Sequence, residues 1–238
     1  MQPPYPSQPA IAAFFDIDGT LTSDNVWKGI IAFFKRRKER QWTHRVFLAL
    51  HYPLSFLRPL RLFSEAKFRS LWASHLPWYF RGYTGAQMKT LAEWVAREFV
   101  ARIERGDVLE KLREHLSRGD VVALVSGAPT PVARAVARMW GIAHAIGSPA
   151  EFRNGRYQGR LADAPCIDEH KAVYARRYLA DQGITVDFAA SYAYADSYTD
   201  LGLFEMVGHP VAVYPDRKLR ALAEERGWEV LDGRKQLS

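Results

Sequence analysis

Carboxylates follow two apolar runs that lie far apart in the sequence. Asp16 and Asp18 come directly after one such run, and Asp196 and Asp200 follow another. Carboxylates gathered at one point repel one another and need a cation between them. Oxygen ligands alone select a hard ion such as Mg²⁺ rather than zinc. The four residues therefore predict a Mg²⁺ site, provided that both runs end at the same place in the fold.

A lysine and a serine would extend such a site toward phosphate chemistry. Lys171 stands near the start of a predicted helix, and Ser126-Gly127 opens a turn before another helix. A hydroxyl and backbone N–H groups at a helix N-terminus can hold an anion. Together with a metal and a lysine, they suit a phosphoryl group. One carboxylate could then act as nucleophile, and a second, two residues away, could protonate the leaving alcohol and activate water.

The elements that must position these residues alternate between strand and helix. Continuous apolar runs bounded by turn residues predict strands buried on both faces. They are Ile11–Phe15, Val121–Val125, Ser191–Ala195 and Val211–Tyr214. The helical patterns between them are Val108–Leu116, Val132–Trp140, Glu169–Asp181 and Leu219–Arg226. This alternation predicts an α/β fold with a parallel sheet, in which ligands bind beyond the carboxyl ends of the strands. Asn154-Gly155 predicts a small hairpin over Phe152–Leu161.

The segment 25–103 has a different character, with many Trp, Phe, Leu and Arg residues and no clear strand runs. Helices are predicted at Glu65–Leu76 and Ala86–Ile103. We expect a helical domain inserted into a core of residues 11–24 and 104–238, after a loosely ordered tail at 1–10. The apolar stretch Val46–Leu57 is too short to span a membrane, so it predicts a buried or an interfacial helix.

The inserted segment also carries the positive charge. Trp27–Ser70 contains eleven Lys or Arg and two Glu, a net of +9, whereas the whole chain of 238 residues has +7. Such a window suits nucleic acid, an anionic membrane surface or a phosphorylated substrate. The single cysteine, Cys166, excludes an intrachain disulfide and a Cys-rich zinc site. It fits a reducing, cytoplasmic location.

In this order the motifs resemble those of haloacid dehalogenase (HAD) superfamily phosphatases, most closely subfamily IB, which includes phosphoserine phosphatase. The first motif is Asp16-Ile17-Asp18-Gly19-Thr20, the second and third are Ser126 and Lys171, and the fourth is Asp196-Ser197-Tyr198-Thr199-Asp200. The resemblance implies a Rossmann-like core with a parallel sheet and an inserted helical cap domain.

The resemblance also implies a role for each motif residue. Asp16 would be the nucleophile and a Mg²⁺ ligand, and Asp18 would be the general acid and base, with its backbone carbonyl on the metal. Asp196 would be the third metal ligand. The remaining roles fall to Ser126 and Lys171 on the phosphoryl oxygens, Asp200 on metal-bound water or on Lys171, and Thr20 and Gly127 in support of the loops.

Three departures argue against phosphoserine as the substrate. No glutamate follows the first motif, the second motif continues as Gly127-Ala128-Pro129 without paired glycines, and Ala195 precedes Asp196 where glycine is usual. We therefore expect a Mg²⁺-dependent phosphomonoester hydrolase that acts on a small phosphorylated metabolite or an amphiphilic phosphate. The alternatives are a phosphotransferase on the same scaffold, or a basic module that binds nucleic acid or membrane without turnover. Of the two partners, we expect nucleic acid less than an anionic membrane surface.

Overall fold

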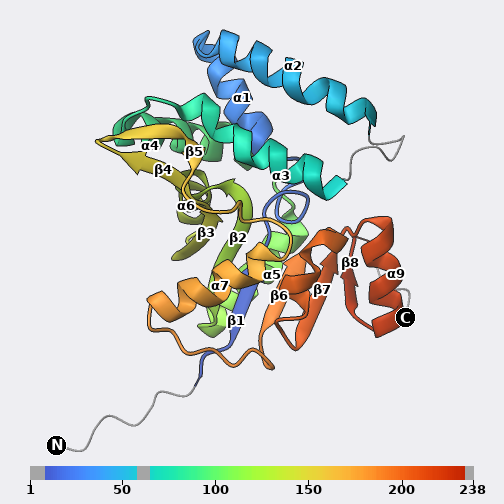
Figure 1. Cartoon of the computed structure of the whole chain (residues 1–238). Helices are drawn as coiled ribbons and strands as arrows, with labels where there is room; N and C mark the ends of the chain where they lie inside the picture. The colour runs from blue at the N-terminus through green and yellow to red at the C-terminus, as the bar shows by residue number, and fades with distance from the viewer. Residues whose placement is uncertain (1–8, 58–64, 234–238) are drawn as a thin grey trace, which may run out of the picture.

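The computed structural model describes residues 9–57 and 65–233. Within these residues, six strands form one parallel sheet in the order β3-β2-β1-β6-β7-β8 (Figure 1). The strands are β1 (Ala12–Phe15), β2 (Val121–Pro129), β3 (His144–Ser148), β6 (Tyr192–Ala195), β7 (His209–Val213) and β8 (Glu229–Leu231). The predicted α/β fold with a parallel sheet is confirmed.

The central strand β1 fixes where the acidic residues meet. It is buried along its whole length and lies between β2 and β6. Its register places Phe15 opposite Tyr194, and the Asp16 N–H donates to the carbonyl of Tyr194 at 2.9 Å. Asp16 and Asp196, 180 positions apart in the sequence, are thereby brought to the same edge of the sheet.

Helices cover both faces of the sheet, as expected for parallel strands that are apolar throughout. On one face, α5 (Gly106–Arg118) and α6 (Thr130–Met139) contribute buried leucines and valines to one apolar cluster. A second cluster holds the side chains of α7 (His170–Asp181), α8 (Leu201–Phe204) and α9 (Arg217–Arg226). The four helical patterns predicted in this part of the chain are confirmed as α5, α6, α7 and α9, each within two residues of the expected ends.

The described residues 26–57 and 65–102, here called the helical insert, lie beyond the carboxyl ends of the strands (Figure 1). The insert contains α1 (Val26–Arg37), α2 (Gln41–Leu57), α3 (Glu65–His75), η1 (Leu76–Phe80), α4 (Gly85–Trp94), η2 (Val95–Phe99) and η3 (Val100–Arg102). The chain enters and leaves it through two paired segments. Ser23 N–H donates to Ile103 at 2.8 Å, and Arg105 N–H donates to Leu21 at 2.9 Å.

The insert is also joined to the rest of the molecule by packing. Met88 and Leu91 of α4 belong to the same apolar cluster as Val132 and Val136 of α6. The hairpin of β4 (Ala150–Arg153) and β5 (Arg156–Leu161) adds a second connection, because its backbone pairs with that of the insert. One part of the insert is therefore held firmly to the core.

Among the helices of residues 9–57 and 65–233, none has the length and apolar character that a membrane span requires.

The predicted hairpin is confirmed, with positive φ angles of 52° and 72° at Asn154 and Gly155. Two other predictions are wrong in their bounds. Strand β2 continues past Val125 to Pro129, because a register irregularity lets Pro129 pair with Ser148. The helix expected at Ala86–Ile103 ends at Trp94 and continues as π- and 3₁₀-helical turns.

Strands β3 and β8 were not predicted. The sequence of β3, His144–Ser148, has no continuous apolar run, and β8 is only three residues long. Most of the expected tail lies outside the described residues. Its last residue is ordered, since Ala10 exchanges backbone hydrogen bonds with Thr185 and Asp187 at 2.9 and 3.0 Å.

Candidate active site

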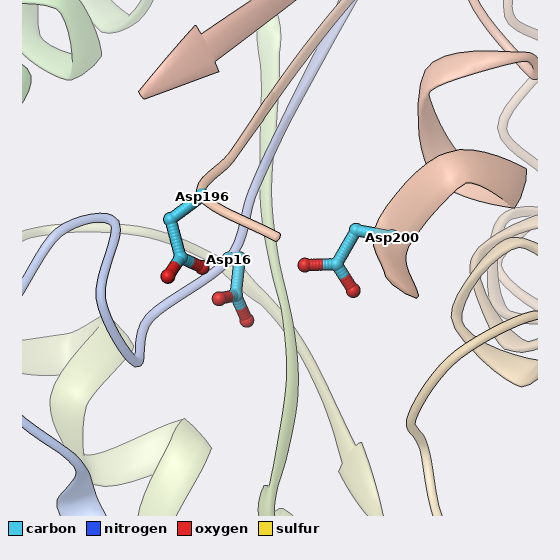
Figure 2. A group of neighbouring side chains, drawn as sticks. All are labelled: Asp16, Asp196 and Asp200. Carbon is cyan, nitrogen blue, oxygen red and sulfur yellow. The ribbon is translucent and has the colours of Figure 1, made fainter. Parts of the chain in front are cut away.

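Three carboxylates meet where β1 and β6 end. Figure 2 shows the side chains of Asp16, Asp196 and Asp200 around a common space, and one oxygen of each lies within 4.8 Å of the others. Asp16 follows β1, Asp196 follows β6, and Asp200 ends the short turn η4 (Tyr198–Asp200). All-oxygen clusters of this kind are suited to a hard divalent cation.

Lys171 supplies the positive charge on one side of this cluster. It is buried in the first turn of α7, and its Nζ lies 2.7 Å from Asp16 Oδ1 and 2.8 Å from Asp200 Oδ1. Burial by itself would lower the pKa of Lys171, but the two carboxylates more than offset burial and raise it. The ammonium is therefore charged at neutral pH and holds Asp16 in one orientation.

Burial raises the pKa of the acidic groups. The pKa of Asp16 rises to about 6, because desolvation outweighs the attraction of Lys171. The pKa of Asp196 rises to about 8, through burial first and then through repulsion from Asp16 and Asp200. Lys171 forms its ion pairs with Asp16 and Asp200. A divalent cation beside Asp196 would supply the charge that this carboxylate needs, so the cluster fits such an ion.

Asp18 lines the same cavity but is not one of the three residues whose carboxylate oxygens lie within 4.8 Å of one another. Its Oδ1 accepts the Val26 N–H at 2.6 Å, at the N-terminus of α1, where Asn25 provides no side-chain cap. Burial, followed by repulsion from Asp16, raises its pKa to about 7. A carboxyl group with this pKa can both give and take a proton near neutral pH.

The loop after β1 is shaped by Gly19 and Thr22. Gly19 has a φ of +84°, and a β-carbon on it would lie 2.2 Å from Asp196 Oδ2. The Thr22 hydroxyl donates to Ile17 and Asp24 carbonyls at 2.8 and 2.7 Å, which closes the loop. Thr20, predicted to support this loop, does so through its backbone N–H, which donates to the Ile17 carbonyl at 3.3 Å.

The structure places Ser126 differently from Gly127. Gly127 lines the cavity beside the carboxylates. Ser126 is fully buried within β2, is not among the lining residues, and its hydroxyl accepts the Ala128 N–H at 3.1 Å. The expected turn directly after Val125 is absent, because β2 continues through both residues. A direct contact between Ser126 and a phosphoryl group stays a prediction.

A cavity of about 420 Å³ opens over the cluster. Its floor holds Asp16, Asp18, Lys171, Asp196 and Asp200. Its opposite wall comes from the helical insert and is mostly apolar, with Trp27, Phe68, Trp72, Ala73 and Leu76. The rings of Trp27 and Trp72 meet edge to face, with centroids 5.0 Å apart. The cavity thus pairs a charged floor with an aromatic wall.

Arg69 crosses the cavity from the insert to the core. Its Nη2 lies 2.9 Å from Asp168 Oδ1, and its Nη1 donates to the Thr199 hydroxyl at 2.6 Å. The sequence marks Arg69 as one of several arginines of the basic window but does not distinguish it. Asp168 carried no sequence signal except its position three residues before Lys171.

The aromatic wall was also missed as a part of the site. The aromatic residues of the insert predict a core, and spacing alone does not show which of them face a cavity. Trp72 belongs both to the apolar packing of the insert and to the wall of the cavity. Its ring packs on Phe47 at a centroid distance of 4.6 Å, and it also lines the cavity. Cys166 lies buried nearby, and burial raises the pKa of its thiol to about 12, so it is not a thiolate nucleophile.

Comparisons with known proteins show the family of the chain. Residues 13–205 match the family model of haloacid dehalogenase-like hydrolases. The phosphoserine phosphatase SerB1 of Mycobacterium tuberculosis is 30% identical over 94% of this chain and 71% of its own length. A histidinol-phosphatase of Neisseria meningitidis serogroup C is 26% identical over 92% of this chain and 97% of its own.

A solved structure has a similar fold over nearly the whole chain. It is a protein of unknown function from Bordetella pertussis Tohama I, with a TM-score of 0.80 and 29% identity, covering 94% of this chain and 99% of the other. The chain belongs to the haloacid dehalogenase-like hydrolases. It is an enzyme of the phosphatase type within that family, as the sequence predicted.

Proposed function

We propose that this protein is a Mg²⁺-dependent phosphomonoesterase that uses Asp16 as its nucleophile. The observation that carries the proposal is the convergence of Asp16, Lys171, Asp196 and Asp200 at the floor of one cavity. Nucleophilic catalysis at phosphorus needs an ionised carboxylate, a fixed orientation and compensation of the phosphate's charge. These residues supply all three.

The metal would be held by the carboxylates of Asp16 and Asp196, with the backbone carbonyl of Asp18 as a further ligand. Bound there, Mg²⁺ would neutralise the negative charge of the phosphoryl oxygens. Asp200 would remain with Lys171, to which it is already paired at 2.8 Å. A bound divalent cation would also lower the pKa of Asp16 and keep this carboxylate ionised for attack.

The protein groups would then act in two steps. In the first, an oxygen of Asp16 forms a bond to phosphorus, the bond to the ester oxygen breaks, and Asp18 gives its proton to the departing alcohol. In the second, Asp18 takes a proton from water as the water oxygen bonds to phosphorus. The aspartyl–phosphorus bond breaks, which releases inorganic phosphate and restores the Asp16 carboxylate. The pKa of Asp18, raised to about 7 by burial, suits both transfers.

We further propose that the segment 25–103, which contains the helical insert, is the cap domain over a core of residues 11–24 and 104–238. Its packing on α6 is apolar, and it is joined to the hairpin by backbone hydrogen bonds and by the Arg156 guanidinium, which donates to the Gly82 carbonyl at 2.7 Å. On the α3 side, polar contacts of Arg69 with Asp168 and Thr199 connect it to the core. Opening of the cavity would break these polar contacts more easily than the apolar packing of α4.

The cavity wall indicates an amphiphilic or aromatic leaving group. Trp27, Phe68, Trp72 and Leu76 offer apolar surface opposite the phosphoryl site. The indole Nε1 of Trp72 is buried and has no hydrogen-bond partner among the described residues, so an acceptor on the substrate would satisfy it. Arg69 already has Asp168 as its partner. These features support an amphiphilic phosphate over phosphoserine.

The direct test is hydrolysis of an aryl phosphate by the purified full chain. We expect turnover with Mg²⁺, loss of turnover in EDTA, and recovery when excess Mg²⁺ is added. Asp16→Asn should abolish turnover while the circular dichroism spectrum is unchanged. Turnover that persists in EDTA, or in Asp16→Asn, would rule out the proposed mechanism.

A further inference from the structure

We propose that the outer face of α2, together with the basic turn before it, binds the surface of an anionic lipid membrane. The helix α2 lies at the far side of the helical insert from the sheet (Figure 1). The proposal does not depend on the catalytic mechanism, because none of the residues that carry it line the cavity above the carboxylates.

Apolar residues are exposed along one side of α2. Trp42, Val46, Ala49, Leu50 and Pro53 stand at positions i, i+4, i+7, i+8 and i+11, which is one face of a helix. Trp42 is 75% exposed, Val46 51% and Leu50 43%. Isolated exposed apolar side chains are common, but a continuous row on one helix marks an interaction surface.

The opposite side of the same helix packs against the rest of the helical insert. Phe47 and His51 are buried, and the Phe47 ring packs edge to face on Tyr79 at 5.4 Å. His51 Nε2 lies 3.2 Å from His75 Nδ1 of α3. The helix is therefore anchored to the insert by one face, and its exposed apolar face is available without any rearrangement of the fold.

The charge beside this face selects an anionic partner. The basic turn is the last turn of α1, with Lys35, Arg36 and Arg37, followed by the C-cap residue Lys38, and all four are exposed. The helix α2 itself contains no Asp or Glu. Arg45 lies among the apolar residues, with its guanidinium 5.7 Å from the Trp42 ring. A helix with an apolar face flanked by basic residues lies in the plane of a bilayer, and anionic headgroups strengthen its binding.

A cavity at the same corner provides a place for a headgroup. It has a volume of about 320 Å³ and lies between α1, α2 and η1. Its wall contains the basic side chains of Lys35 and Arg45, one carboxylate, Glu39, and the side chains of Ile31, Phe34, Gln41, His44 and Tyr79. The Glu39 carboxylate is paired with Arg37 at 2.7 Å. A lipid phosphate could contact Lys35 and Arg45 there while its acyl chains lie along Val46 and Leu50.

Charge and composition favour this occupant over the alternatives. A second copy of the chain would bring together two surfaces that both carry this excess of positive charge, which is unfavourable. Single-stranded nucleic acid requires several stacking rings in a basic groove. The exposed apolar side chains of α2 include two aromatic rings, Trp42 and Tyr52, and the others are aliphatic. A mostly aliphatic surface with a basic edge matches a lipid surface.

The experiment is sedimentation of the full chain with vesicles of phosphatidylcholine, either pure or with 30% phosphatidylglycerol (roughly the anionic content that such electrostatic binding requires). We expect binding to the anionic vesicles, at least about tenfold weaker binding to the neutral ones, and weakening by salt. Val46→Glu and Leu50→Glu should each reduce anionic-vesicle binding by about tenfold or more. Val173→Glu is the matched control, because Val173 is 60% exposed on α7, away from the insert.

A charge control separates local from overall electrostatics. Removal of three charges from the basic turn (Lys35, Arg36 and Lys38 to Gln) should weaken binding strongly. Removal of three exposed charges elsewhere (Arg113, Arg134 and Arg138 to Gln) should have little effect. Hydrolysis of a soluble aryl phosphate by the same variants reports on the catalytic proposal separately.

Any of four results would overturn the inference, and the first three concern the wild-type protein and Leu50→Glu. These three are an absence of vesicle binding, equal binding to neutral and anionic vesicles, and a solution dimer that Leu50→Glu dissociates. The last result would make the α2 face a contact between copies of the chain. Equal effects of Val173→Glu and Val46→Glu would likewise contradict it.

Discussion

Gly19 lies against Asp196 so closely that a β-carbon on Gly19 would stand 2.2 Å from Asp196 Oδ2. The first motif and the fourth motif are thus in direct contact, and the space for the Asp196 carboxylate exists because residue 19 has no side chain. The same glycine has a φ of +84°, which residues with a β-carbon rarely adopt.

Gly19→Ala should therefore displace Asp196 and lower Mg²⁺-dependent turnover by about 10²-fold or more. Gly141→Ala is the matched control, because Gly141 has a φ of +75° but a β-carbon added to it would meet no atom within 4 Å. Gly141→Ala should lower only the free energy of unfolding, by about 1–3 kcal/mol, which is the backbone strain that a β-carbon adds at a positive φ. Steady-state kinetics and thermal unfolding of both variants distinguish the two effects. Equal activity of the two variants would show that the close approach of Gly19 to Asp196 is not needed for catalysis.

Lys171→Met should lower turnover by about 10³-fold, since Lys171 orients Asp16 and compensates its charge. The control is Lys28→Met, which removes another lysine–aspartate pair, Lys28–Asp24 at 2.6 Å, from the exposed surface. Surface pairs contribute about 0–1 kcal/mol, so Lys28→Met should retain near-normal kinetics. If Lys171→Met kept wild-type turnover, Lys171 would be no more than a structural partner of the carboxylates.

Trp72→Ala tests the aromatic wall. We expect kcat/KM for naphthyl phosphate to fall by about tenfold or more, with little change for a short alkyl phosphate, because apolar contacts to a leaving group are worth about 1–3 kcal/mol. Trp42→Ala removes a tryptophan that is 75% exposed and outside the cavity, so it should change neither value. A parallel loss for both substrates in Trp72→Ala would indicate a general structural defect rather than selectivity.

The folded protein should lose stability on acidification through His115. Its Nδ1 lies 2.7 Å from Asp120 Oδ2 and its Nε2 lies 2.8 Å from the Tyr194 hydroxyl. Burial lowers the pKa of His115 below its ordinary value of 6.5, despite the nearby carboxylate of Asp120. The unfolded chain then binds the proton more tightly than the folded chain. The contribution of neutral His115 to the free energy of unfolding is fully present above pH 6.5. It falls as the pH drops below that value, by up to about 1.4 kcal/mol per pH unit.

Urea unfolding at about pH 7.5 and about pH 5.5 measures this decrease in the free energy of unfolding. His115→Gln should be less stable at the higher pH and should show a smaller decrease between the two values. His209→Gln, at an exposed position, should keep the pH dependence of the wild type. The comparison between variants also removes the opposite contribution of Asp16, Asp18 and Asp196, whose raised pKa values favour the folded state at low pH. An unchanged pH dependence in His115→Gln would assign the effect to other groups.

The sheet and the acidic cluster could be predicted because both depend on local signals. Asp16 and Asp196 stand directly after apolar strands, and parallel strands bring their carboxyl ends to one edge. Lys171 could be placed by the motif order, although its two ion pairs are visible only in three dimensions.

The remaining parts of the site depend on how the insert packs. Helical spacing defines the faces of α3 but does not show that Arg69 meets Asp168 or that Trp72 lines the cavity. Ser126 shows the converse limitation, because serine and glycine after an apolar run indicated a turn. The register irregularity that extends β2 depends on pairing with β3, a strand that the sequence did not predict.

The central claim is that Asp16 accepts the phosphoryl group. The most direct measurement is rapid quenching of the enzyme with substrate and Mg²⁺, followed by borohydride reduction and peptide mass spectrometry. An acyl phosphate on Asp16 would be reduced to homoserine, and we expect that conversion at position 16 alone, with none when substrate is omitted. Modification at another residue, or an unmodified Asp16 during active turnover, would contradict the account.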